Sequence, residues 1–134
     1  MFSLPDKDGK YVDHQGLLDT RNTHGLILTK LVERHGLETE EDNGCWSTDT
    51  GRFNTSKKAV VQNMKLPNFT RKRIIKTSIF SINLNANQKC KAIFGLDFLV
   101  ANGIDFINNS GERIKWDRSS ILMYNKLYVN RVKI

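Results

Sequence analysis

The ten residues Gly16–Gly25 constrain the fold of this 134-residue chain more than any other stretch. They read Gly-Leu-Leu-Asp-Thr-Arg-Asn-Thr-His-Gly, so an apolar run ends in Asp19 and a turn-rich segment follows. This pattern predicts a short buried strand that carries a carboxylate onto a tight loop. A simple Asx-turn at the end of a strand is the alternative interpretation of Asp19.

Asp49 is a second candidate for the functional carboxylate, because the sequence Asp-Thr-Gly occurs once, at positions 49–51. The short segments on either side, 45–48 and 52–55, predict a β-hairpin with this turn at its tip. A carboxylate that performs chemistry must be held in a pocket by a rigid apolar strand. Basic residues follow Asp49 closely, so we expect an exposed tip there and take Asp19 as the functional carboxylate.

The rest of the chain consists of short apolar segments separated by turn-forming residues, which predicts a mostly β domain. Asp8-Gly9 is expected to be the tip of a hairpin between the first two strands. The expected strands are Phe2–Leu4, Tyr11–Leu18, Ala59–Leu66, Ile74–Leu84, Cys90–Phe94, Ile104–Ile107, Arg113–Trp116 and Leu122–Val129.

Two short helices are also expected, at Leu28–His35 and at Leu96–Ala101. Gly36 would end the first helix, and Asn102-Gly103 would end the second. The acidic run Glu38–Asn43 and the polar run 85–89 are expected to be loops. A strong turn signal lies at 108–111.

Several motifs, taken together in their order along the chain, indicate a family resemblance that no single motif would indicate. One of these motifs is an Ile-aliphatic-Gly turn that precedes a short helix with Asp97 and Leu99. Together the motifs resemble the retropepsin-like aspartic protease domain of gypsy-type LTR retrotransposon polyproteins, over roughly Gly9 to Met123. In chain order they are Asp19-Thr20, Gly51–Thr55, Leu66–Phe69, Ile93–Leu99, Ile104–Asp117 and Ile121–Met123.

The resemblance implies a small, closed, barrel-like β fold with one short C-terminal helix, working as a homodimer. Residues 1–123 would form this domain, and residues 124–134 would be a basic C-terminal extension. In this family each subunit supplies one Asp, and the pair activates a water that attacks a peptide carbonyl. Asp19 would be that catalytic residue, and no cofactor would be needed.

The resemblance also assigns roles around Asp19. The hydroxyl of Thr20 would brace the loop across the dimer axis, and Ile93 and Phe94 would line a substrate pocket. Gly95 would permit a sharp turn into the helix. The hairpin after the loop would be the flap that closes over a peptide; its named residues are Trp46, Thr48, Asp49, Thr50, Gly51 and Phe53.

Arg21 departs from the family pattern, because retropepsins have Gly at that position. Glycine lets the backbone approach the dyad and the substrate without a side chain. A cation beside the dyad favours the doubly ionised state, whereas the chemistry needs one shared proton. We therefore expect weak or no proteolysis. Asn22 departs as well, since a small Ala or Ser is usual there, although Asn is tolerated in a turn.

Two alternatives to an active peptidase stay open. The first is a pseudoprotease that keeps the fold and the dimer as a peptide-binding or assembly module. The second is a small basic β-domain that binds nucleic acid. It is suggested by the excess of 21 basic over 14 acidic residues, which gives a net charge of +7. The basic residues form separate clusters rather than one stripe, so ordinary solvated surface is the simpler explanation.

The remaining features restrict location and metal chemistry. No apolar run is long enough to span a membrane, and the start lacks the pattern of a signal peptide. An intracellular protein is expected, in the cytoplasm or in a retroelement particle, with segments of its own polyprotein as substrates and non-specific nucleic acid as a further partner. The two Cys and three His lack metal-ligand spacing, so no metal site is expected.

Overall fold

The structure is a computed structural model that describes residues 1–48, 51–84, 90–107, 113–116, 119–122 and 131–133. The turn residues Asp49 and Thr50, the run 85–89, the turn at 108–111 and residues 123–129 of the last expected strand lie outside the described residues. In chain order the elements are β1 (Phe2–Pro5), β2 (Tyr11–His14), β3 (Gly16–Asp19), β4 (Leu26–Leu28), α1 (Thr29–Arg34), β5 (Glu38–Thr48), β6 (Gly51–Leu66), β7 (Thr70–Ile82), β8 (Ala92–Phe94), α2 (Leu96–Asn102), β9 (Ile104–Ile107), β10 (Arg113–Trp116), β11 (Ser119–Leu122) and β12 (Arg131–Lys133).

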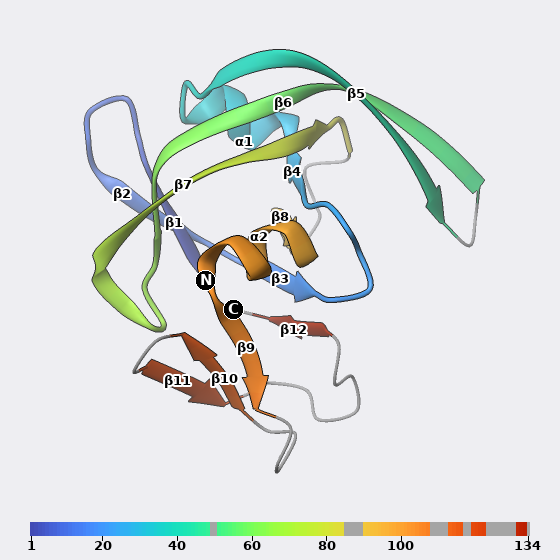
Figure 1. Cartoon of the computed structure of the whole chain (residues 1–134). Coiled ribbons are helices and arrows are strands. Elements are labelled where there is room, and N and C mark those ends of the chain that lie inside the picture. Colours follow the sequence, from blue (N-terminus) through green and yellow to red (C-terminus); the bar gives the residue numbers. More distant parts are fainter. Residues whose placement is uncertain (49–50, 85–89, 108–112, 117–118, 123–130, 134) are drawn as a thin grey trace.

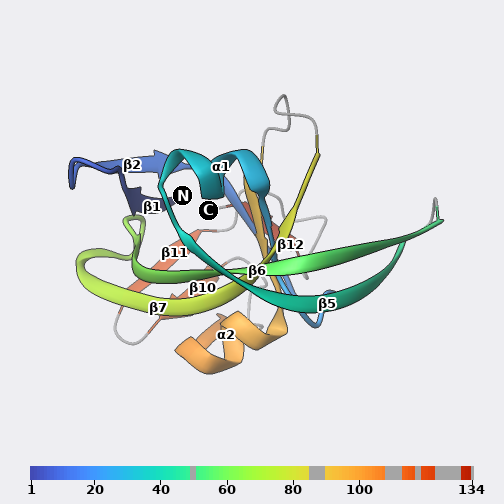
Figure 2. The same ribbon diagram turned by 90° about the horizontal axis from the view of Figure 1, so that it is seen from above.

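Most strands belong to one nine-stranded sheet with the order β12-β3-β8-β4-β7-β6-β1-β2, and β5 pairs with β6. A separate three-stranded sheet has the order β11-β10-β9. Figure 1 shows this small sheet below the main one, and it shows β5 and β6 continuing into an arm that leaves the body. Figure 2 shows α1 and α2 on opposite sides of the long strands.

The core lies where the inward faces of these strands meet the two helices. Inward positions alternate along β6, as expected for a half-buried strand. Fully or almost fully buried members are Phe2, Leu4, Leu18, Ile27, Val61, Met64, Leu66, Ile75, Phe94, Phe98, Leu99, Ile114 and Trp116. No helix among the described residues is both long and apolar enough to cross a lipid bilayer.

Several expectations are confirmed with small changes of length. The first hairpin pairs Phe2 with His14, and Gly9 at its tip has a φ of 86°. The expected strand Tyr11–Leu18 is split into β2 and β3. Gly36 follows the end of α1 with a φ of 60°, and Gly103 caps α2 with a φ of 65°. Both values lie in the left-handed region that glycine adopts readily.

The expected acidic loop at Glu38–Asn43 is wrong, because these residues begin β5. The register places Glu40 opposite Lys58 and Glu41 opposite Lys57 on β6. Opposite charges across an antiparallel pair stabilise the strands, and the backbone gains its ladder hydrogen bonds. A shift in register between Glu41 and Gly44 accommodates the polar residues in between.

The division of the chain at residue 123 stays a prediction. The segment after it nevertheless contributes a strand, since β12 runs antiparallel to β3 with Arg131 opposite Asp19. Residues 131–133 are therefore part of the main sheet.

Candidate active site

Asp19 lies at the end of β3, which is buried over its whole length. β3 runs between β8, to which it is parallel, and β12. The strand fits there because Gly16 has no side chain: an added Cβ would lie 2.8 Å from the ring of Phe94 and 2.9 Å from that of Phe2. Asp19 itself is only 4% exposed. An apolar strand therefore holds this carboxylate at the base of a loop.

The carboxylate of Asp19 accepts hydrogen bonds from the loop that follows it. The backbone N–H of Arg21 donates to Oδ1 at 3.0 Å, and the side-chain amide of Asn22 donates to Oδ2 at 3.3 Å. The backbone N–H of Asn22 also donates to the carbonyl of Asp19 at 3.3 Å. Such bonds fix the orientation of the carboxylate. They also make this segment an Asx-type turn, while the catalytic role of Asp19 stays a prediction.

The guanidinium of Arg21 lies beside this carboxylate, with Nε 3.6 Å from Oδ1 of Asp19. The Arg21 side chain is 56% exposed and that of Asp19 is 5% exposed. Solvent therefore screens the pair, and its contribution to stability is small. Its position still puts a positive charge next to the candidate catalytic oxygen. Thr20, between the two, is half-buried.

The loop packs against the start of α2. The backbone N–H groups of Leu96 and Asp97 donate to the carbonyls of Asn22 and Thr23, at 2.8 and 3.0 Å. Gly95 makes this approach possible, because an added Cβ would lie 2.7 Å from the carbonyl oxygen of Asn22. Its φ of −90° is ordinary for any residue. The expected reason for this glycine, a sharp turn, is therefore replaced by close packing against the loop.

His24 connects the loop to three other elements. Its Nδ1 is 3.2 Å from Oδ2 of Asp97 in α2. Its ring also meets Trp46 on β5 and Phe80 on β7 edge to face, with centroids 6.3 and 5.7 Å apart. From the sequence, no role is assigned to His24 or Phe80. No signal in one sequence links His24 to Asp97, which lies 73 positions away.

The expected hairpin exists as the arm of β5 and β6, and its role as a flap stays a prediction. Trp46 stacks on Phe53 with centroids 6.0 Å apart, meets Phe80 at 5.3 Å, and donates from Nε1 to the hydroxyl of Thr55 at 3.0 Å. Thr48 ends β5, and Gly51 begins β6 with a φ of 142°. Trp46 therefore links the arm to the Asp19 loop through its contact with His24.

The expected substrate pocket needs a correction at Phe94. This residue is fully buried and packs on Phe2 and Phe98, with centroids 5.3 and 4.5 Å apart. Its alternating position on β8 turns it into the core, so it is not pocket-lining. Ile93 is half-buried, and its pocket role stays a prediction.

A surface cavity of about 490 Å³ lies beside the base of the arm, away from Asp19. It is lined by Thr29, Phe53, Asn54, Thr55, Ser56, Lys57, Ser81, Ile82, Asn83 and Leu84. Within the described residues, no group of three or more His, Cys, Asp or Glu side chains is arranged to hold a metal ion.

Comparison with known proteins gives evidence at the level of fold. No protein-family model matches the chain, and no curated protein matches it significantly. A solved structure that is similar is the retroviral protease-like domain of Ddi1 from Leishmania major. The similarity has a TM-score of 0.54 and covers 95% of this chain and 92% of that chain, at 14% sequence identity. An identity this low supports the fold alone. The chain has a retropepsin-like fold, mostly β, with a nearly closed, barrel-like sheet.

Proposed function

We propose that this domain is an aspartic endopeptidase of the retropepsin type that processes a retroelement polyprotein, with proteolysis held low by Arg21. The polyprotein would be processed in the cytoplasm or in a retroelement particle. The observation that carries the proposal is the buried carboxylate of Asp19 at the end of β3, oriented by donors of its own loop.

The reaction needs two such carboxylates, so the proposal includes a homodimer. Two close carboxylates do not both ionise readily, and they share a proton. The ionised Asp19 would take a proton from the attacking water, and the protonated Asp19 of the second copy would donate to the peptide carbonyl. The arm of β5 and β6 would close over the peptide and exclude water.

Arg21 opposes this chemistry by its charge and its size. Its guanidinium lies 3.6 Å from Oδ1 of Asp19, which favours the ionised carboxylate. A homodimer holds two such cations, so the shared proton is disfavoured twice. The side chain also fills space in which a glycine would let peptide backbone approach.

A second candidate function follows from the same ion pair. If Arg21 keeps both carboxylates ionised, the domain binds extended peptides or assembles without cutting them. The fold, the arm and the dimer would then serve as a pseudoprotease module.

Peptide-library cleavage between roughly pH 4 and 7 separates these functions. Four proteins are compared: the natural chain, Arg21→Gly, Arg21→Lys, and Arg21→Gly with Asp19→Asn. We expect strong cleavage in Arg21→Gly, weak or no cleavage in the natural chain and in Arg21→Lys, which keep a cation, and none in the double variant, which loses the carboxylate. Equal cleavage by the natural chain would show that Arg21 is harmless. No cleavage by folded, dimeric Arg21→Gly would reject the peptidase and favour the binding module.

A further inference from the structure

The charges of this chain are strongly segregated along the sequence. No Asp or Glu occurs between Asp49 and Asp97. The two long strands β6 and β7 lie inside this interval, and all of their charged residues are basic. These are Arg52, Lys57, Lys58, Lys65, Arg71, Lys72, Arg73 and Lys76.

At the arm, the acidic strand β5 compensates these cations. Glu40 and Glu41 lie opposite Lys58 and Lys57 in the register, and Nζ of Lys58 is 3.8 Å from a carboxylate oxygen of Asp42. The positive charge at this end of β6 is therefore largely balanced.

At the opposite end, the β6–β7 turn and the strand residues that follow or precede it carry five further basic residues. We call this the basic turn surface: Lys65, Arg71, Lys72, Arg73 and Lys76. Arg71 is 3.8 Å from Asp13, and its side chain is 72% exposed. Asp13 also accepts a hydrogen bond from Ser3, so its charge is shared. Lys72 and Lys76 on β7 are both exposed.

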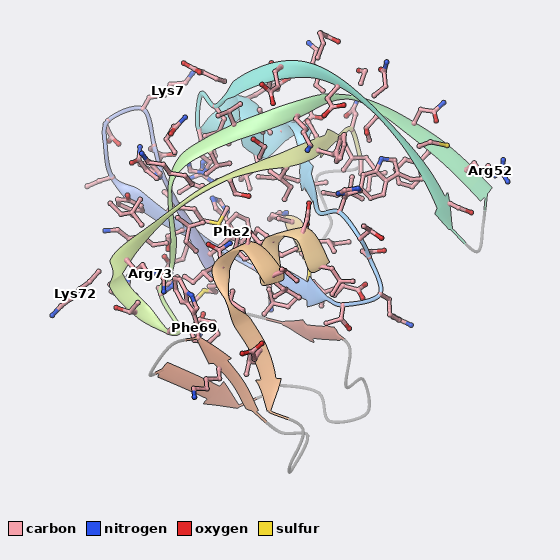
Figure 3. The ribbon with its side chains drawn as sticks, viewed as in Figure 1. Phe2, Lys7, Arg52, Phe69, Lys72 and Arg73 are labelled. Atoms are coloured by element: carbon pink, nitrogen blue, oxygen red, sulfur yellow. The ribbon has the colours of Figure 1, made fainter. Side chains whose placement is uncertain are left out.

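Aromatic rings hold two of these cations in place. Nζ of Lys65 lies 4.1 Å from the ring centroid of Tyr11, and the guanidinium of Arg73 lies 4.4 Å from that of Trp116. Trp116 is fixed in turn, since its Nε1 donates to the carbonyl of Asn102 at 2.8 Å and its ring meets Phe69. Cations held this way lose little freedom when they bind an anion. Figure 3 shows Phe69, Lys72 and Arg73 together at this turn and Arg52 at the far end of the arm.

We propose that the basic turn surface binds single-stranded nucleic acid through its phosphates, without regard to sequence. Exposed apolar groups here are single, Tyr11 at 37% and Ile74 at 51% exposure, which is too little for a hydrophobic protein interface. Clustered cations beside an exposed ring are instead typical of sites that contact phosphates and stack on bases. The inference does not depend on proteolysis.

Salt-dependent binding of a labelled oligouridine RNA of about 20 nucleotides, followed by fluorescence anisotropy, tests this proposal. Each lost phosphate contact lowers the slope of log affinity against log salt by about 0.7. We expect Lys72→Gln with Lys76→Gln to lower the slope by about 1.4. The matched control, Arg52→Gln with Lys30→Gln, removes the same charge from exposed positions elsewhere and should leave the slope nearly unchanged.

Three outcomes would overturn the proposal. One is no RNA binding at low salt. Another is an equal loss of slope in both double variants, which would mean that net charge alone acts. The last is equal binding, with the same salt slope, of polyglutamate or of vesicles containing equal phosphatidylserine and phosphatidylcholine. Thermal unfolding of each variant, measured in parallel, confirms that all four substitutions leave the fold intact.

Discussion

At the scale of single residues, the candidate site depends on places where backbone comes close to backbone. Gly95 lies against the carbonyls of Asn22 and His24, and Gly25 would place a Cβ 2.5 Å from the carbonyl of Ile93. Backbone atoms cannot swing aside as the end of a flexible side chain can. Gly95 therefore sets the distance between the Asp19 loop and the start of α2, and Gly25 sets the distance between the end of the loop and β8.

Gly95→Ala should lower the free energy of unfolding by about 3 kcal/mol, because the new methyl group forces the loop and α2 apart. Urea unfolding measures this loss. Gly9→Ala is the control, since Gly9 has nothing within 4 Å and only its φ of 86° opposes a side chain. That change should cost about 1 kcal/mol. Equal losses in the two variants would show that contact with the loop is not what requires Gly95.

A buried histidine pair joins the first hairpin to α1. Nε2 of His14 and Nε2 of His35 are 2.8 Å apart. Nδ1 of His35 is 3.0 Å from the carbonyl of Pro5, which can only accept, so His35 donates there and accepts from His14. Burial, the neighbouring His35 and then Arg34 lower the pKa of His14 to about 4. Asp6, 3.2 Å from Nδ1 of His35, acts in the opposite direction.

This pair predicts a loss of stability in mild acid. The pKa of His14 is about 4 in the folded protein and near 6.5 in the unfolded chain, so the unfolded chain takes up the proton first as the pH falls. Stability decreases between pH 6.5 and 4, and His14 should account for about 2 kcal/mol at pH 5. Urea unfolding of His14→Gln at pH 7 and pH 5 should show a smaller decrease. A decrease that is unchanged in His14→Gln would contradict the assignment.

At the scale of elements, the sequence predicted those strands, turns and helices that are specified by their own residues and immediate neighbours. The apolar run into Asp19, the Asp8-Gly9 tip and the helix ended by Gly103 are confirmed because turn residues and periodicity specify them locally. The first half of β5, Glu38–Asn43, was missed because its acidic residues are stabilised by lysines on another strand. Phe94 was misassigned because its pocket role came from the family resemblance alone, whereas the alternation along β8 turns its side chain into the core.

The contacts of the site could not be predicted, because they join residues that are far apart in the sequence. The pairing of His24 with Asp97 and the approach of Trp46 to Phe80 join segments that only the folded sheet brings together. Arg21 is the exception, since its nearness to Asp19 follows from two positions of sequence separation.

The arm of β5 and β6 is held to the body by the aromatic contacts of Trp46. Gly44 leaves room for the indole, which meets Phe53, Phe80 and His24. Trp46→Ala removes all of these contacts, worth about 1 kcal/mol or more, and should speed amide exchange of residues 44–47 and 52–55 roughly tenfold. Hydrogen-exchange NMR measures this. The exposed neighbour Cys45→Ala is the control, and equal exchange in both variants would show that Trp46 does not anchor the arm.

At the scale of the whole molecule, one chain assembles only half of the proposed chemistry. The sheet places Asp19 between β8 and β12, the loop rests on α2, and the arm reaches toward the loop. Each chain contributes Asp19 once. The proposed reaction needs one base and one acid at the same peptide bond, so the site is incomplete without a second copy.

Subunit mixing tests this two-chain site directly. Arg21→Gly is refolded with an equal amount of the Arg21→Gly, Asp19→Asn chain, with total protein held constant. In a homodimer that pairs at random, about one quarter of the dimers hold two Asp19 residues, so activity should fall to about one quarter of that of Arg21→Gly alone. A site contained in one chain would instead retain about one half. Peptide cleavage measures the difference, and sedimentation of each mixture verifies that dimers form. Retention of one half would mean that Asp19 works without its copy, and the dyad mechanism would have to be abandoned.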